Sequence, residues 1–176
     1  MSSYLNEPDT DSDEEIICTL TEEEKEEIKN QCLLLKQEGN EFFKTQQYEE
    51  AIKKYTAIIN LQKTSKLPVD DIVLTNRSAT YLALKKYVPA SHDALQAAKI
   101  NRDNWKAHWR YAISLLEMVP KRFRTKLAIS ALEECAKCST LPPDKLSEVH
   151  EKLNYANARL AKQDAETPMP DMSNCA

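Results

Sequence analysis

The chain has 176 residues, of which 41% are hydrophobic and 30% are charged, and its formal net charge is −4. This length fits one domain with tails. A single glycine argues against β-sandwiches and β-barrels, whose turns need glycine, so we expect an all-α protein. No apolar run approaches the roughly 18 residues that span a membrane. The acidic start does not resemble a signal or transit peptide, and we expect a cytoplasmic protein.

The charge is unevenly distributed along the chain. Residues 1–30 contain 11 Asp and Glu against 2 Lys, whereas the remainder has 22 Lys and Arg against 17 Asp and Glu. Residues 1–20 are acidic and lack hydrophobic periodicity, so we expect a disordered tail. Residues 165–176 contain two prolines and are expected to be flexible. The mildly basic remainder favours an anionic partner, but not nucleic acid, which calls for a denser basic stripe.

The first predicted helix follows a capping box, Thr21–Glu24, and runs to about Lys44. Its apolar stripe consists of Ile28, Cys32, Leu35, Phe42 and Phe43. Gly39 lies inside this helix, where glycine costs about 1 kcal/mol relative to alanine. We therefore expect a neighbouring helix to approach too closely there for a side chain. A second helix begins at Tyr48 and is broken by Thr64–Pro68.

Hydrophobic spacing predicts five further helices. The third spans Ile72–Leu84, with candidate buried positions Ile72, Val73, Thr75, Ala79 and Leu82. The fourth has Pro89 in its first turn, and its inner face includes Ala90, Ala94, Leu95 and Ala98. The fifth is capped by Asn101 or Asp103, carries Trp105, Trp109, Ala112, Leu115 and Leu116, and ends at Val119–Pro120. The sixth is marked by Leu127, Ala128, Ala131, Leu132 and Cys135, and the seventh covers about 144–163 after Pro142–Pro143.

No catalytic or metal-binding pattern stands out. Five cysteines, an odd number, indicate free thiols in a reducing compartment. The pair Cys135-x-x-Cys138 lacks the two further ligands of a zinc site. The three histidines lie on different predicted helices, and one glycine cannot form a phosphate-binding loop. We expect no enzyme, no metal and no cofactor; an enzyme subunit remains an alternative, which would need an activity dependent on His108 or on the cysteine pair.

An internal repeat sets the architecture. Asn76 and Arg110 are 34 residues apart in successive helix pairs, and Tyr48 and Tyr87, 39 apart, each open a second helix. The pattern resembles the tetratricopeptide repeat, a helix–turn–helix unit of 34 residues. The resemblance implies a right-handed superhelix of three helix pairs plus a C-terminal capping helix, within a domain of residues 21–164. Its repeats would cover about 32–65, 71–104 and 105–140, with the cap at 144–163.

Two departures from this repeat concern its turns. None of the three units ends in the usual proline, since Lys63, Arg102 and Thr140 stand at those places. The third unit also has about four additional residues in its turn. We expect these differences to change local turn shape and not the stacking, because each unit must bury its apolar face against its neighbours.

In such a stack, the first helix of each pair lines the inner groove. The polar residues on these helices are Lys36 and Asn40, then Asn76, then Lys106 and Arg110. Each i, i+4 pair points one way, so three cations and two amides converge on one strip. Arginine can grip a carboxylate with two parallel bonds. Such a strip suits two nearby carboxylates, as at the end of an extended peptide that terminates in aspartate.

This set is similar to the two-carboxylate clamp of tetratricopeptide co-chaperones, and the segment Asn76-Arg77-Ser78-Ala79 matches the clamp's second element. The resemblance implies that the groove holds the C-terminal Glu-Glu-Val-Asp tail of cytosolic heat shock protein 90, heat shock protein 70, or both. The same resemblance places Phe43, Ala79 and Leu82 around the ligand's valine and preceding side chain. No nucleic acid or membrane partner is expected, and a monomer is assumed.

Three alternatives stay open at this point. The cations could be ordinary solvated side chains, and the two asparagines could make local helix hydrogen bonds. The groove could serve a general protein–protein scaffold with an unrelated partner. The acidic tail could itself compete for the basic groove, in which case deletion of residues 1–20 would tighten peptide binding.

Overall fold

The computed structural model describes residues 20–166. The predicted acidic tail, apart from Leu20, and the C-terminal segment beyond Glu166 lie outside the described residues. The part of the chain that the structure describes contains helices and no strand. Its helices are α1 (Glu22–Lys44), α2 (Tyr48–Thr64), α3 (Asp71–Ala83), α4 (Tyr87–Ile100), α5 (Trp105–Glu117), α6 (Arg122–Lys137) and α7 (Leu146–Glu166), with the 3-10 turn η1 (Pro143–Lys145) before α7.

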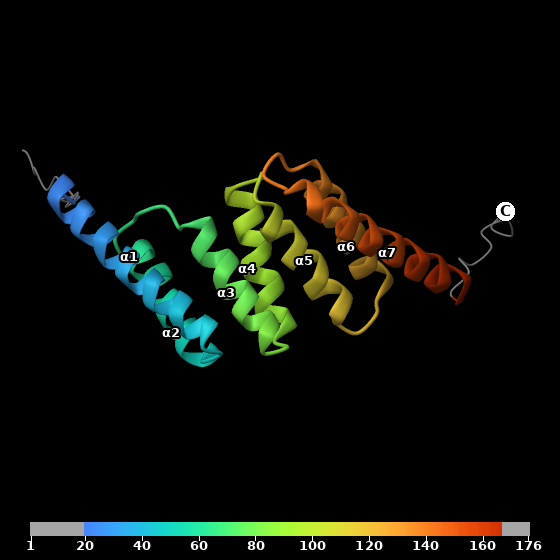
Figure 1. Ribbon diagram of the computed structural model, residues 1–176, viewed down its shortest axis with the longest axis horizontal. Helices are drawn as coiled ribbons and strands as arrows, with labels where there is room; N and C mark the ends of the chain where they lie inside the picture. Colours follow the sequence, from blue (N-terminus) through green and yellow to red (C-terminus); the bar gives the residue numbers. More distant parts are fainter. Residues whose placement is uncertain (1–19, 167–176) are drawn as a thin grey trace, which may run out of the picture.

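The helices follow one another along the long axis of the molecule, from α1 at one end to α7 at the other (Figure 1). Each consecutive pair packs together: α1 with α2, α3 with α4, α5 with α6, and α7 against α6. The first helices of the pairs are also neighbours, since α3 contacts both α1 and α5. The all-α prediction, with three helix pairs and a capping helix, is therefore confirmed. None of the helices between residues 20 and 166 combines the length and apolarity needed to cross a membrane.

The predicted capping box at the start of α1 is present. The Thr21 hydroxyl accepts the backbone N–H of Glu24, and the Glu24 carboxylate accepts the backbone N–H of Thr21. Three helices end in a left-handed residue without glycine: Gln46, Lys66 and Lys85 have φ of 60°, 54° and 55°. Each of these turns closes with the paired backbone hydrogen bonds of a Schellman motif. Each of the turns after α1, α2 and α3 therefore holds one polar, non-glycine residue in the left-handed region.

Gly39 is used for close packing, as the sequence predicted. It is the buried residue of α1, and an added Cβ would lie 2.8 Å from Cε1 of Tyr55 on α2. The Tyr55 side chain is itself buried at 1% exposure. The missing side chain thus lets the tyrosine ring pass under α1 and reach the face that carries Asn40.

We predict that Gly39→Ala destabilises the fold by about 1–2 kcal/mol. Alanine gains about 1 kcal/mol of helix propensity, but an extra methyl group in a packed core costs about 1–3 kcal/mol or more, and here it meets the ring of Tyr55. Urea denaturation measures the change. In a Tyr55→Leu background the same substitution should cost less, because the ring is gone; equal costs in both backgrounds would contradict this explanation.

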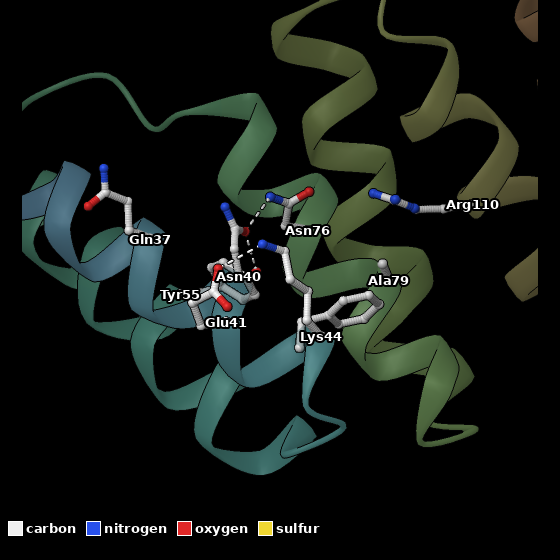
Figure 2. A pocket seen from close by; sticks show the side chains of 9 residues that line it. Gln37, Asn40, Glu41, Lys44, Tyr55, Asn76, Ala79 and Arg110 are labelled. Atoms are coloured by element: carbon white, nitrogen blue, oxygen red, sulfur yellow. Dashed lines mark hydrogen bonds and ion pairs between the residues drawn. The ribbon is translucent and has the colours of Figure 1, made fainter.

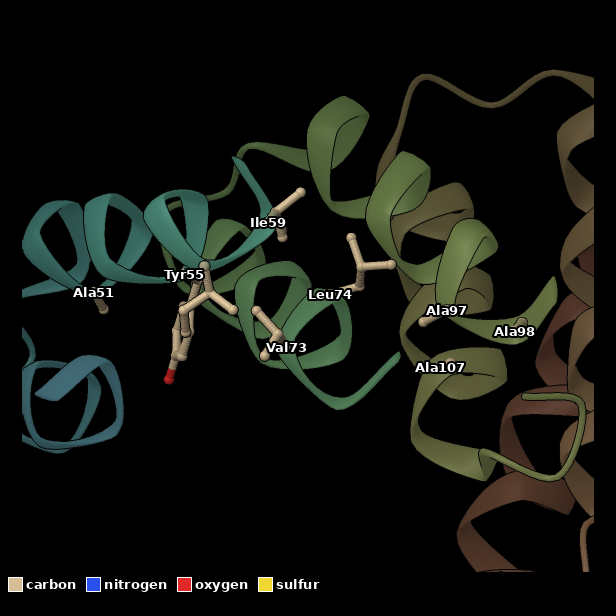
Figure 3. Packing of buried hydrophobic residues seen from close by; sticks show 9 residues of the cluster. Ala51, Tyr55, Ile59, Val73, Leu74, Ala97, Ala98 and Ala107 are labelled. Atoms are coloured by element: carbon tan, nitrogen blue, oxygen red, sulfur yellow. The ribbon is translucent and has the colours of Figure 1, made fainter. Parts of the chain in front are cut away.

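Small side chains lie where the helices of the core cross one another. One cluster joins α2 to α5 through Ala51, Tyr55, Ile58, Ile59, Val73, Leu74, Ala97, Ala98 and Ala107 (Figure 3). A second cluster joins α5, α6 and α7. One predicted buried position was wrong, because Ile72 is 53% exposed. It lies beside the buried Val73, which faces the core instead.

Candidate functional site

A groove crosses the first helices of the three pairs and reaches the capping helix. Its central hollow, of about 420 Å³, is lined by Gln37, Asn40, Glu41, Phe43, Lys44, Tyr55, Asn76, Ala79 and Arg110. Its cap-side hollow, of about 300 Å³, is lined by Ala79, Leu82, Trp105, Lys106, Trp109, Arg110, Lys145, Glu148 and Val149. Because Ala79 and Arg110 line both, the two hollows are adjacent. We call them together the inner groove.

Two asparagines meet at the base of the central hollow (Figure 2). The Nδ2 of Asn76 donates to Oδ1 of Asn40 at 3.2 Å, and the hydroxyl of Tyr55 donates to the same oxygen at 2.7 Å. Desolvation raises the pKa of Tyr55 to about 12, so this hydroxyl stays protonated and remains a donor at neutral pH. With its oxygen held by two donors, Asn40 has its amide N–H groups left to donate to an anion.

Arg110 is a cation without an acidic partner in the part of the chain that the structure describes. One guanidinium nitrogen, Nη1, donates to the backbone carbonyl of Thr75, and no carboxylate between residues 20 and 166 forms an ion pair with Arg110. Desolvation lowers its pKa to about 10, so the group is still charged at neutral pH. Figure 2 shows its side chain extending from α5 toward Asn76. A half-buried, uncompensated charge of this kind is costly unless it serves to bind an anion.

The four side chains of the segment Asn76–Ala79 have three different surroundings. Asn76 and Ala79 line the central hollow. Arg77 points the other way, where Nε and Nη2 donate to the two carboxylate oxygens of Asp93 on α4 at 2.7 and 2.8 Å. The buried Ser78 hydroxyl donates to the carbonyl of Ala90 at 2.8 Å. These contacts fix α3 against α4, and thereby set the direction in which Asn76 faces.

The start of α5 is fixed by Asn104, which corrects the predicted caps Asn101 and Asp103. The side-chain oxygen of Asn104 accepts the backbone N–H of Ala107 at 3.1 Å. Its Nδ2 donates to Asp71 at 2.8 Å and to the hydroxyl of Thr75 at 3.0 Å. Spacing alone could not choose among three polar residues in one turn; the contact with α3 selects Asn104 and so positions Lys106 and Arg110 along α5.

The predicted residues are only partly brought together. Asn40, Phe43, Asn76, Ala79 and Arg110 line the central hollow, whereas Leu82 and Lys106 line the cap-side hollow. Lys106 is exposed, and its Nζ lies 5.8 Å from the ring centroid of Trp105. Lys36 lines neither hollow.

Lys36 instead lines a third hollow, of about 400 Å³, which we call the N-terminal hollow. There its Nζ lies 3.3 Å from Oδ2 of Asp70, the N-cap residue of α3. The apolar side of this hollow includes Ile28, Cys32, Leu33, Ile58, Leu67 and Val73. The i, i+4 spacing of Lys36 and Asn40 therefore placed them on one helix face but not in one hollow.

Several groove residues escaped the sequence reasoning. On α1, Gln37, Glu41 and Lys44 join Asn40 at helical spacing, and Glu41 pairs with Lys44 at 2.7 Å. Lys145 at the end of η1 and Glu148 on α7 border the cap-side hollow, together with the two tryptophans of α5, Trp105 and Trp109. The 3–4-residue spacing on α1 was a usable signal, whereas the approach of α7 depends on tertiary packing.

The cysteine pair is buried and its thiols are held in the neutral form. Desolvation raises the pKa of Cys135 to about 12, and it also raises the pKa of Cys138. Cys135 Sγ donates to the carbonyl of Trp105 at 3.4 Å. Within residues 20–166, no three His, Cys, Asp or Glu side chains gather as a metal site would require. The imidazole Nε2 of His108 is hydrogen-bonded to the carbonyl of Arg102 at 2.9 Å.

Three stacked helix pairs, a capping helix and a groove across the first helices define the tetratricopeptide-repeat fold, a right-handed superhelix, and this chain has that fold. No family model matches the sequence. The sequence is similar to RNA polymerase II-associated protein 3: 27% identical to the Rattus norvegicus protein over 169 residues and 32% identical to the Homo sapiens protein over 127 residues. These matches cover 94% and 68% of this chain but 24% and 18% of those proteins.

Solved structures similar to this chain include a domain of the same relative. The first tetratricopeptide domain of Spaghetti (RPAP3), bound to the HSP90 peptide SRMEEVD, has a TM-score of 0.63 at 26% identity, over 75% of this chain and 94% of that one. The tetratricopeptide domain of Sgt2 from Aspergillus fumigatus has a TM-score of 0.60 at 25% identity, over 82% of this chain and 90% of that one. The chain thus resembles single tetratricopeptide domains, and it spans less than a quarter of the length of the curated relatives named above.

Proposed function

We propose that this chain is a peptide-binding adaptor of the co-chaperone type, and that its inner groove holds the C-terminal Glu-Glu-Val-Asp segment of heat shock protein 90 or heat shock protein 70. Arg110 carries the proposal, because a half-buried guanidinium with no acidic partner among residues 20–166 needs an external anion. Two neighbours at 26% identity, the first and second tetratricopeptide domains of Spaghetti, are bound to the HSP90 peptide SRMEEVD. Their ligand ends in the same four residues.

In this proposal the clamp consists of Lys36, Asn40, Asn76, Lys106 and Arg110. The two terminal carboxylates of the peptide lie over the central hollow, where Arg110 and the amide of Asn40 donate to them. Phe43, Ala79 and Leu82 then contact the valine and the preceding side chain; Phe43 is 36% exposed and Ala79 lies between the two hollows. We place this activity in the cytoplasm and expect binding without catalysis or cofactor.

Asn40→Ala and Lys106→Ala should each weaken binding of a Met-Glu-Glu-Val-Asp peptide by about tenfold or more. A charge-assisted hydrogen bond contributes about 1.5–3 kcal/mol, and about 1.4 kcal/mol corresponds to a factor of ten in Kd. Isothermal titration calorimetry measures both. Lys126→Ala, which removes one exposed charge from α6, is the matched control and should leave Kd unchanged.

Unchanged titrations for both groove variants would refute the clamp. In that case the groove would serve as a scaffold for an unrelated partner. A similar loss with Lys126→Ala would show that binding depends on net charge and not on these side chains.

A further inference from the structure

Lys36 is paired with an acidic residue of the protein itself. Its Nζ lies 3.3 Å from Oδ2 of Asp70, and the two side chains are only 28% and 26% exposed. Lys36 therefore lines the N-terminal hollow with Asp70, one turn away from Asn40 in the central hollow. This member of the proposed clamp is therefore turned toward Asp70 and away from the central hollow.

Asp70 is the fixed member of this pair. Its other carboxylate oxygen, Oδ1, accepts the backbone N–H of Ile72 at 2.8 Å as the N-cap of α3. Its own backbone N–H donates to the side chain of Gln62 at 3.2 Å. Lys36, by contrast, carries its ammonium on a flexible four-carbon stem. A change of partner therefore requires the lysine to move and leaves Asp70 in place.

We propose that Asp70 is an affinity- and specificity-determining residue of the groove, because it competes with the ligand carboxylate for Lys36. The inference rests on the proposed function. An incoming peptide must draw the ammonium away from Asp70 or share it, so Lys36 adds little net affinity. Binding then depends mainly on Arg110, Lys106 and the two asparagines. The groove therefore prefers peptides whose carboxylates contact those side chains over peptides that could contact only Lys36.

The test is Asp70→Asn, measured by calorimetry with the Met-Glu-Glu-Val-Asp peptide. Asparagine is as good an N-cap as aspartate, so the helix cap survives while the competing charge is lost. Ion pairs of this exposure are weak, and we expect Kd to tighten about three- to fivefold. The control is Glu38→Gln, which removes one negative charge from the Lys54–Glu38 pair between α1 and α2. It should not change Kd beyond experimental error.

Lys36→Ala distinguishes competition from a general charge effect. In the wild-type chain it should change Kd by no more than about twofold, whereas in the Asp70→Asn chain it should abolish the whole gain. A weaker or unchanged Kd for Asp70→Asn, or a gain that persists without Lys36, would overturn the inference while leaving the clamp intact. If neither the wild type nor Asp70→Asn binds the peptide, the proposed function fails, and the inference fails with it.

Discussion

Arg110→Met should abolish most peptide binding without destabilising the fold. The substitution removes the cation that lies between the central and cap-side hollows. Loss of a two-pronged, charge-assisted contact costs several kcal/mol, so we expect Kd to rise by at least about fiftyfold. Calorimetry with the Met-Glu-Glu-Val-Asp peptide measures this loss, and Arg110→Lys, which keeps the charge but not the fork geometry, should recover part of it.

The stability of the same variant separates a binding role from a structural one. Desolvation lowers the pKa of Arg110 to about 10, well below its ordinary value, so the folded chain holds the charged form less well than the unfolded chain does. This cost is fully present below pH 10 and disappears as the pH rises through the ordinary value. At pH 7 the substitution by methionine removes this desolvation cost. The melting temperature of the variant should therefore stay the same or rise. A fall in melting temperature that accompanies the lost binding would make Arg110 a structural residue.

Asp93→Ala should cause the largest loss of stability, about 3–5 kcal/mol. The Asp93 side chain is 2% exposed and accepts two bonds from Arg77, which also donates to Thr56 at 2.9 Å. Although burial opposes it, the bond to Asp93 raises the pKa of Arg77. Removal of one partner leaves a buried charge unpaired, which is far costlier than the pair is worth. Because Arg77 joins α2, α3 and α4, urea denaturation monitored by circular dichroism should record the effect as a loss of global stability.

A double variant tests the reason for this loss. Arg77→Met with Asp93→Leu replaces the pair by apolar groups, and it should recover most of the stability that Asp93→Ala loses. A loss below about 1 kcal/mol for Asp93→Ala, or a double variant as unstable as the single one, would contradict the assignment of Asp93 as a buried ionic partner.

The helices could be predicted because their hydrophobic spacing and prolines are local signals. The capping box at Thr21 and the packing role of Gly39 followed from the same kind of reasoning. The errors arose where tertiary contacts choose between neighbours: Asn104 caps α5 because Asp71 and Thr75 hold it. Helical spacing assigns a residue to a broad face, which is why Ile72, beside the buried Val73, was wrongly expected in the core.

The candidate site shows the same difference between features set by local spacing and features set by tertiary contacts. Spacing placed Asn40 and Asn76 on facing helices, and their side chains do meet. Spacing could not foresee that Asp70 holds Lys36, since that contact depends on how the α2–α3 connection folds back beside α1. Nor could it foresee that α7 contributes to the groove. The local sequence determines which side chains share a helix face. The hydrogen-bond or ion-pair partner of each side chain depends on how the helices pack together.

Titration of this chain with two forms of one peptide tests the central claim most directly. The peptide Met-Glu-Glu-Val-Asp with a free C-terminus should bind with a Kd on the order of micromolar, and more weakly at high salt. The same peptide with a C-terminal amide keeps every side chain but loses one of the two carboxylates, so its binding should fall by at least about tenfold. Equal affinities for the two forms, or no binding of the free acid, would contradict the assignment of the inner groove as a two-carboxylate clamp.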